Sequence, residues 1–163
     1  MRVAAEYVKE KFTYPMVAAE VGVERGHNAL DMLEHMTFQK LYLIDHYAPY
    51  ADYLGGMCPQ DVQDWVYVEM FTRVQAFLDR VVFITRPSTL ASTLFPNEFF
   101  DFIYIDGNHD YDKVKEDMAL WFPKVKVGGV MGGHDFDIRN ITRQDVAEAV
   151  KDFAKENSLQ SSV

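Results

Sequence analysis

Cysteine is almost absent from this sequence, and long hydrophobic runs are missing altogether. The one cysteine, Cys58, cannot form an internal disulfide, which is typical of proteins from a reducing compartment. No stretch approaches the roughly 20 apolar residues needed to span a bilayer, and residues 1–12 lack the apolar run of a signal peptide. We therefore expect a cytoplasmic protein without a membrane partner.

Basic residues are also scarce, since 16 Lys and Arg stand against 25 Asp and Glu, for a formal net charge of -9. This charge repels phosphate backbones, so we expect no nucleic acid partner. The 163 residues and the 48% hydrophobic content are enough for one domain with a sizeable core. We find no repeat or linker, and we predict a single domain over residues 1–163.

Short apolar segments alternate with segments in which apolar residues recur at helical spacing. The predicted strands cover residues 16–21, 41–44, 81–84, 100–105 and 129–132. The predicted helices cover about residues 3–12, 29–36, 60–78, 88–94, 111–122 and 144–156. Because near-continuous apolar strands separated by helices form parallel sheets with both faces covered, the predicted fold class is α/β, with a doubly wound, mainly parallel sheet.

Polar residues follow every predicted strand, at residues 20–26, 45, 86–88, 106–109 and 134–137. Ligands of doubly wound sheets bind beyond the carboxyl ends of the strands. Packing alone does not explain polar residues at each of these positions, although any one of them would be weak evidence. We therefore expect the functional site at this edge of the sheet.

The first of these segments contains Gly22 and Gly26, which permit close approach of a ligand to the backbone. The segment lacks the third glycine of the dinucleotide fingerprint and the GK[ST] ending of a phosphate-binding loop. A carboxylate at Glu20 would moreover repel phosphate. An ordinary tight turn remains the alternative interpretation.

Asp45 ends the second predicted strand. A carboxylate at this position can accept hydrogen bonds from both hydroxyls of a ribose. The alternative interpretations are a helix N-cap and a solvated loop acid.

Four motifs stand at these strand ends in a characteristic order: EVGVERGHN at 20–28, LID at 43–45, FDFIYIDGNHDY at 100–111 and KVGGVMGGHDF at 126–136. With them the sequence resembles class I S-adenosylmethionine-dependent methyltransferases, and within these the small O-methyltransferase-like domains, over about residues 14–156. The resemblance implies a Rossmann-like fold and S-adenosylmethionine as cofactor.

The resemblance also implies where the cofactor lies. The glycine loop would lie beneath its methionine part, the acid after the second strand would hold its ribose, a serine would lie at the adenine edge, and Asp106 would lie beside its amino-acid end and the acceptor. The implied cofactor-binding residues are Glu20, Gly22, Glu24, Gly26, Asn28, Asp45, Ser88 and Asp106. An acidic site suits this cofactor because a sulfonium and an ammonium both carry positive charge.

Metal-assisted relatives hold a divalent cation with acids at the ends of the fourth and fifth strands. The matching residues are Asp106 and Asp135, with His134 as a further candidate, and Mg²⁺ or another divalent cation as the ion. The catechol-type relatives place an amide after the second acid, where this sequence has Phe136, which cannot ligate, so that His134 or Asp137 would have to substitute. Asp135 as a helix cap or in a salt bridge is the alternative.

His109 and Asp106 are the predicted catalytic residues. An imidazole titrates near neutral pH, and His109 lies just past the fourth strand, where relatives place a base or a group that contacts the acceptor. A structural histidine bonded to a loop carbonyl is the alternative. His27, His35 and His46 have weaker claims.

The segment 47–56 holds three tyrosines beside paired glycines, and we expect it to be a mobile cover over the pocket of a small-molecule acceptor. The helical stripe of Trp65, Tyr67, Phe71 and Phe77 predicts core packing or a subunit contact, compatible with a homodimer. The acids Glu116, Asp117 and Glu148 are interpreted as a solvated helix face.

Relatives usually finish with an antiparallel strand pair, whereas residues 158–163 leave room for one short strand, so this pair is expected to be truncated. The predicted function is O-methylation of a small-molecule hydroxyl, with or without a metal. A non-catalytic cofactor-binding or assembly module is the alternative favoured by the short C-terminus. A nucleotide-dependent oxidoreductase is disfavoured by the missing third glycine.

Overall fold

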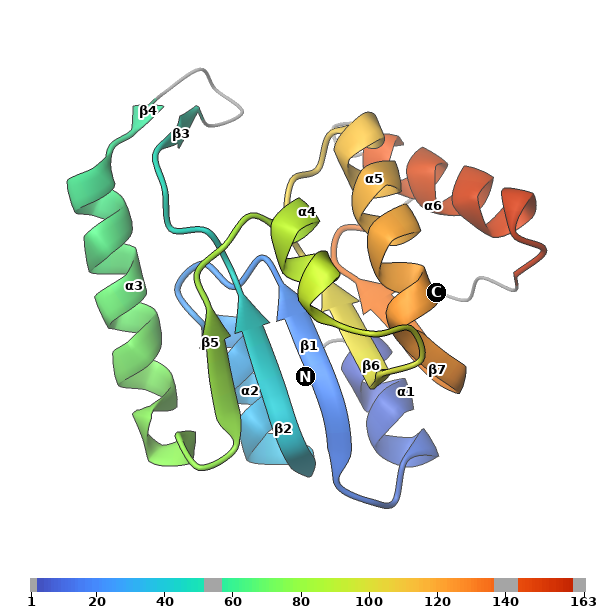
Figure 1. Ribbon diagram of the computed structural model, residues 1–163, viewed down its shortest axis with the longest axis horizontal. Coiled ribbons are helices and arrows are strands. Elements are labelled where there is room, and N and C mark those ends of the chain that lie inside the picture. Colours follow the sequence, from blue (N-terminus) through green and yellow to red (C-terminus); the bar gives the residue numbers. More distant parts are fainter. Residues whose placement is uncertain (1–2, 52–56, 137–143, 160–163) are drawn as a thin grey trace.

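A computed structural model describes residues 3–51, 57–136 and 144–159. Its main sheet has five parallel strands in the order β5-β2-β1-β6-β7. The strands are β1 (Met16–Val21), β2 (Phe38–Ile44), β5 (Val81–Ile84), β6 (Phe100–Ile105) and β7 (Val125–Gly133). The chain runs outward from β1 in one direction and returns to β6 on its other side, so the order reverses between the two (Figure 1).

Helices cover both faces of this sheet (Figure 1). One face is covered by α1 (Val3–Lys11), α2 (His27–His35) and α3 (Gln60–Val74), and the other by α4 (Ser88–Ala91) and α5 (Tyr111–Trp121), against which α6 (Gln144–Glu156) packs. Short 3-10 turns extend α3, α4 and α5 at Gln75–Phe77, Ser92–Leu94 and Phe122–Lys124. Among the described residues, no helix combines the length and apolar character needed to cross a membrane.

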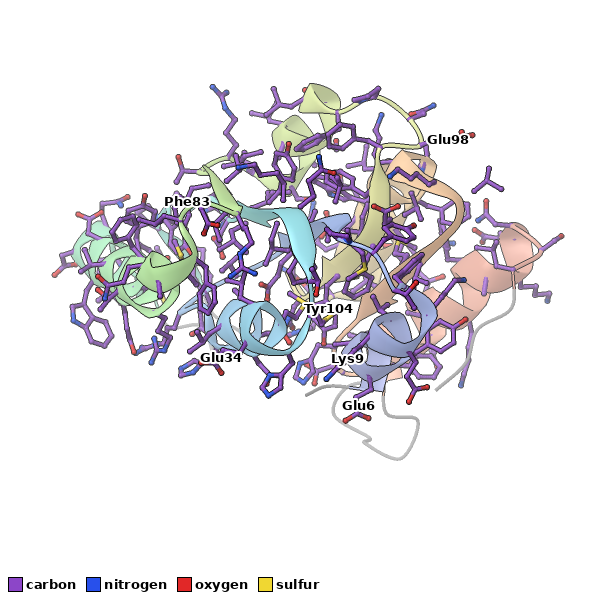
Figure 2. The ribbon with its side chains drawn as sticks, turned by 90° about the horizontal axis from the view of Figure 1, so that it is seen from below. Glu6, Lys9, Glu34, Phe83, Glu98 and Tyr104 are labelled. Carbon is purple, nitrogen blue, oxygen red and sulfur yellow. The ribbon has the colours of Figure 1, made fainter. Side chains whose placement is uncertain are left out.

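Both faces of the sheet are apolar because side chains alternate along each strand. In β6, Phe102 and Tyr104 pack on the side of α1 to α3, whereas Ile103 packs with Trp121 of α5 on the other side. Figure 2 shows Tyr104 on the inner side of the first helix layer, with Lys9 and Glu34 pointing outward. The continuous apolar strands of the sequence are thus explained by burial on both faces.

One buried acid ties the amino ends of three strands together. Asp101 of β6 accepts hydrogen bonds from the Val17 N–H at 2.8 Å and from the Tyr14 hydroxyl at 3.1 Å. The Lys126 ammonium of β7 lies 2.8 Å from the same carboxylate. The bonds satisfy a charge that would be costly to bury alone, and they lie at the sheet edge opposite the predicted site.

The predicted doubly wound parallel sheet is confirmed, and the predicted limits of β1, β5 and β6 agree with the structure. Between β2 and α3, where no strand was predicted, the chain contains a small antiparallel pair of β3 (Tyr50–Ala51) and β4 (Met57–Cys58). The cover predicted for 47–56 lies partly outside the described residues. Within the described part of the chain, no strand pairs with the outer edge of β7.

Core packing or a subunit contact was predicted for the aromatic stripe, and Trp65 lies outside the core, because it is 55% exposed and lies against the Arg25 guanidinium, 4.7 Å from the ring centroid. Phe71 is 38% exposed. Only Tyr67 and Phe77 of the stripe pack against the core. Helical spacing alone could not separate this outer face from the inner one, which carries Val66 and Met70.

Candidate functional site

Gly22 brings the loop after β1 against the loop after β6. Its φ is 85°, and a Cβ at this position would lie 2.3 Å from the Asp106 carbonyl oxygen. The Gly22 N–H donates to the Ile44 carbonyl at 2.9 Å, and the Asp106 N–H donates to the Val21 carbonyl at 2.8 Å. Only glycine combines this left-handed backbone with so close an approach, so Gly22 joins the ends of three strands.

Asp45 holds the backbone of the glycine loop. Its Oδ2 accepts hydrogen bonds from the N–H groups of Val23 and Glu24, both at 2.9 Å, and its Oδ1 accepts one from the Tyr47 N–H at 3.2 Å. The exposed Glu24 side chain takes no part in this arrangement, because the residue contributes its backbone groups. The predicted alternatives of a helix N-cap and a solvated acid therefore do not describe Asp45.

Glu20 and Asn28 form a buried polar pair beneath this loop. Glu20 is 1% exposed and Asn28 is 7% exposed, and the Asn28 amide donates to Glu20 Oε1 at 3.0 Å. Asn28 can reach β1 because Gly26, with a φ of 73°, turns the chain into α2 and leaves its Cα against Met70 of α3. The loop and the first turn of α2 thus enclose a carboxylate at the switch point of the sheet.

Tyr47 closes the other side of the loop, a role that the sequence did not indicate. Its hydroxyl donates to the Glu24 carbonyl at 2.9 Å, and its own carbonyl accepts from the Gln60 amide at 3.0 Å. Burial, followed by the nearby carboxylates of Asp45 and Glu20, raises the pKa of Tyr47 far above its ordinary value. The hydroxyl is therefore a neutral donor at physiological pH.

Four polar side chains meet where β6 and β7 end. His109 Nε2 lies 3.7 Å from Asp106 Oδ1 and 3.1 Å from Asp135 Oδ2. His134 Nδ1 lies 3.4 Å from Asp106 Oδ1 and 3.2 Å from Asp135 Oδ1. We call these four residues the His-Asp cluster. The structure thus brings together both predicted catalytic residues and all three predicted metal ligands.

Strand pairing fixes the backbone of the His-Asp cluster, and one of its residues has a left-handed backbone conformation. Ile105 pairs with Gly133, and the His134 N–H donates to the Ile105 carbonyl at 3.2 Å, which fixes the two loops relative to one another. Asp135 has a φ of 62°, a left-handed conformation that is uncommon outside glycine and often found at functional sites. Asp137, proposed as a substitute ligand, lies outside the described residues.

Ser88 has a partner that the sequence did not indicate. Its hydroxyl donates to the Asp117 carboxylate and accepts a hydrogen bond from the Trp121 indole N–H at 2.7 Å. The interpretation of Asp117 as a solvated residue is wrong, because Asp117 is only 8% exposed and burial raises its pKa. Asp117 lies three residues after Val114 and four before Trp121, on the same buried face of α5. This helical spacing was the sequence signal that Asp117 is buried.

The other three histidines lie away from the His-Asp cluster. His27 is exposed at the start of α2, and His35 lies 3.2 Å from Asp31 on the same helix. His46 Nδ1 accepts a hydrogen bond from the Ala48 N–H at 2.9 Å. From their sequence positions, these histidines were weaker candidates for a catalytic role than His109, and their placement is consistent with that ranking.

A family model described as a methyltransferase domain matches residues 19–136, which span the glycine loop and the His-Asp cluster. No curated protein sequence matches the chain. Several solved structures share the fold at low identity. A protein from Corynebacterium glutamicum is 12% identical with a TM-score of 0.64, and the alignment covers 91% of this chain and 67% of the other.

The similar structures include two methyltransferases that are named for the reaction they catalyse. The 1,6-didemethyltoxoflavin-N1-methyltransferase of Burkholderia thailandensis, solved with its small-molecule substrate and S-adenosylhomocysteine, is 19% identical with a TM-score of 0.53 over 80% of this chain and 49% of its own. The precorrin-6y C5,15-methyltransferase of Geobacter metallireducens is 12% identical with a TM-score of 0.59. The alignment covers 91% of this chain and 68% of the other. This chain therefore spans about half the length of the Burkholderia enzyme, and these likenesses establish the fold.

Proposed function

Because the chain belongs to the methyltransferase domain family and has the fold of class I S-adenosylmethionine-dependent methyltransferases, we propose that it transfers a methyl group from this cofactor to a hydroxyl of a small molecule. The observation that carries the proposal is the His-Asp cluster, which lies beside the glycine loop at the switch point of the sheet. The names of the Burkholderia and Geobacter enzymes specify nitrogen and carbon acceptors, so the hydroxyl acceptor is our own inference.

The residues around the glycine loop suit the amino-acid end of the cofactor. Bound S-adenosylmethionine supplies a methyl group activated by a sulfonium. Glu20 offers a buried carboxylate that would attract the cofactor's positive charges, and Asn28 holds that carboxylate in place. Gly22 and Gly26 keep side chains away from the loop, and Asp106 lies next to Gly22, where the cofactor and the acceptor would meet.

Asp45 and Ser88 are proposed for the nucleoside. The Asp45 carboxylate has about four acceptor positions, of which the three backbone N–H groups use three, so that a ribose hydroxyl can still donate to it. Glu24 shapes this end of the loop through its backbone. The Ser88 hydroxyl already donates to Asp117, so it would contact an adenine edge as an acceptor.

His109 is proposed to receive the proton that the acceptor hydroxyl loses. Its Nε2 lies 3.7 Å from Asp106 Oδ1 and 3.1 Å from Asp135 Oδ2, so both carboxylates face this nitrogen. His109 is 27% exposed at its side chain, so that a small molecule can reach it from solvent. Holding the acceptor here in line with the methyl group supplies the remaining rate enhancement.

A divalent cation at Asp106, His134 and Asp135 would fit the same place. The three side chains offer two carboxylates and an imidazole, since His134 Nδ1 lies 3.4 Å from Asp106 Oδ1 and 3.2 Å from Asp135 Oδ1. Such an ion would lower the pKa of the acceptor hydroxyl. Phe136 contributes no ligand, so Mg²⁺ would have to complete its coordination with water.

We also propose a cytoplasmic homodimer that makes no contact with nucleic acid or membranes. The outer face of α3 supports the homodimer, since Trp65 and Val68 are more than half exposed there. Light scattering on the purified protein tests this state, and a monomer at micromolar concentration would contradict it.

The experiment that tests the enzyme activity measures S-adenosylhomocysteine release with a panel of phenols, sugars and polyols, followed by mass spectrometry of the methylated product. We expect methylation on oxygen, with a rate that falls about a hundredfold in His109→Ala. His35→Ala is the matched control, because it removes a histidine beside an acid outside the His-Asp cluster. Methylation on nitrogen or carbon would contradict the proposal, and cofactor binding without turnover would favour a non-catalytic module.

A further inference from the structure

We propose that the His-Asp cluster binds a first-row transition-metal ion through both of its imidazoles and the Asp106 carboxylate, in preference to Mg²⁺. The proposal rests on the function proposed above, because it concerns the same site. It adds His109 to the ligands and specifies the chemical class of the ion.

The first argument is the spacing of the donor atoms. Metal–ligand bonds of about 2.1 Å place two ligand atoms about 3.0 Å apart at a right angle and about 3.4 Å apart at the tetrahedral angle. Asp106 Oδ1 lies 3.7 Å from His109 Nε2 and 3.4 Å from His134 Nδ1. The ligand atoms of these three residues all lie within 4.8 Å of one another, so one ion could reach them with small side-chain adjustments.

The second argument is the position of Asp135. Its two carboxylate oxygens lie 3.1 Å from His109 Nε2 and 3.2 Å from His134 Nδ1. Each imidazole therefore directs one nitrogen toward two carboxylates, from Asp106 on one loop and Asp135 on the other. Two carboxylates also balance the charge of a divalent ion, and Asp135 can serve as the fourth ligand.

The third argument is that the His-Asp cluster has a rigid backbone and is open to solvent. The loops are joined by the pairing of Ile105 with Gly133 at the ends of two parallel strands, so the donors need little reorganisation. The side chains of His134 and His109 remain 40% and 27% exposed, whereas that of Asp135 is 9% exposed. An ion held from the protein side would keep positions open toward solvent for water or an acceptor hydroxyl.

The donor types select the ion. Mg²⁺ prefers oxygen ligands, whereas imidazole nitrogen favours ions such as Fe²⁺, Co²⁺ and Zn²⁺. Two nitrogens among three or four protein donors therefore favour the second group. In the metal-bound protein the His109 nitrogen would be a ligand, and its role as proton acceptor belongs to the protein without metal.

The test is calorimetric titration of the tag-free, metal-stripped protein with ZnCl₂ and, separately, MgCl₂. We expect one Zn²⁺ per chain, bound about a hundredfold more tightly than Mg²⁺. Cobalt chloride is a second probe, because a four- or five-coordinate site with imidazole ligands gives the ion stronger, shifted visible absorption bands than those of hexaaqua Co²⁺.

Variants assign the ligands. His109→Ala and His134→Ala should each weaken Zn²⁺ binding about tenfold or more, and Asp106→Asn should do the same. His109→Gln repeats the test with a longer side chain should the alanine variant unfold, and circular dichroism checks folding. His35→Ala, which removes an exposed histidine beside Asp31, should leave Zn²⁺ binding unchanged. Equal affinity for Mg²⁺ and Zn²⁺, or Zn²⁺ binding unaffected by loss of His109, would overturn the proposal.

A parallel titration with S-adenosylhomocysteine separates this inference from the proposed function. Binding of S-adenosylhomocysteine with weak Zn²⁺ binding would overturn the metal proposal and leave the methyltransferase proposal intact. Zn²⁺ binding without any binding of S-adenosylhomocysteine would overturn the proposed function and leave a metal site of another purpose.

Discussion

The hydroxyl of Tyr47 donates a hydrogen bond to the carbonyl oxygen of Glu24 at 2.9 Å and so joins the loops that follow β2 and β1. Both residues have left-handed backbones, with φ values of 45° and 49°. Such conformations cost about 1–3 kcal/mol each and persist where surrounding contacts fix them. This bond is therefore one of the contacts that hold the proposed cofactor loop in shape.

Replacing Tyr47 by Phe should lower the free energy of unfolding by about 1–2 kcal/mol, because the Glu24 carbonyl loses its donor while the ring packing remains. Urea denaturation measures the loss. Tyr7→Phe is the control, since the exposed Tyr7 on α1 should change the free energy by less than about 0.5 kcal/mol. Equal stability of the two variants would mean that the loop does not depend on this bond.

Gly22→Ala should destabilise the protein by about 3 kcal/mol, because it combines left-handed strain with a Cβ that meets the Asp106 carbonyl oxygen at 2.3 Å. Gly128→Ala separates the two causes. Gly128 has a φ of 79°, and a Cβ there meets nothing within 4 Å, so strain alone should cost about 1 kcal/mol. Chemical denaturation of both variants checks the difference, and a Gly22 variant no less stable than the Gly128 variant would contradict the close approach.

Much of the sheet could be predicted from the sequence because buried parallel strands are continuous apolar runs bounded by polar residues. The fifth strand was predicted over 129–132, whereas β7 begins at Val125. Lys126 and Gly128 interrupt the apolar run, and Lys126 is accommodated in the strand because it lies 2.8 Å from the buried Asp101. Contacts between β6 and β7 thus accompany the extension of β7 beyond its apolar run, and a local pattern cannot show them.

The site was predictable where it depends on strand ends and less so where it depends on tertiary contacts. Asp106, His109, His134 and Asp135 meet because parallel strands place their carboxyl ends at one edge. Asp45 and Ser88 also lie past strand ends, but their partners come from the glycine loop and from α5. The sequence position of a polar residue therefore indicated its neighbourhood and not its hydrogen bonds.

Asp117→Asn should become more stabilising as the pH rises. Burial raises the pKa of Asp117 in the folded protein, so the folded state binds this proton more tightly than the unfolded state does. Its contribution to stability is therefore fully present below the unfolded value of about 3.9 and is lost as the pH rises through the folded pKa. Asparagine does not titrate and can still accept the bond from Ser88.

Urea denaturation of wild type and Asp117→Asn between pH 4 and 7 measures this change. Glu148→Gln on the exposed face of α6 is the control. The free energy of unfolding of Asp117→Asn should rise relative to that of wild type as the pH increases. If this difference stays constant, or changes in favour of wild type, Asp117 is not desolvated in the folded protein.

Calorimetric titration with S-adenosylhomocysteine tests most directly whether the glycine loop and Asp45 form a cofactor site. We expect binding with a dissociation constant of about 1–100 μM, weakened about tenfold in Asp45→Asn, because a neutral amide accepts a weaker hydrogen bond from a ribose hydroxyl than a carboxylate does. Asp79→Asn, at the amino end of β5, should bind as wild type does. Absence of binding heat with both S-adenosylhomocysteine and S-adenosylmethionine would contradict the account. Equal affinity of wild type and Asp45→Asn for S-adenosylhomocysteine would contradict it as well.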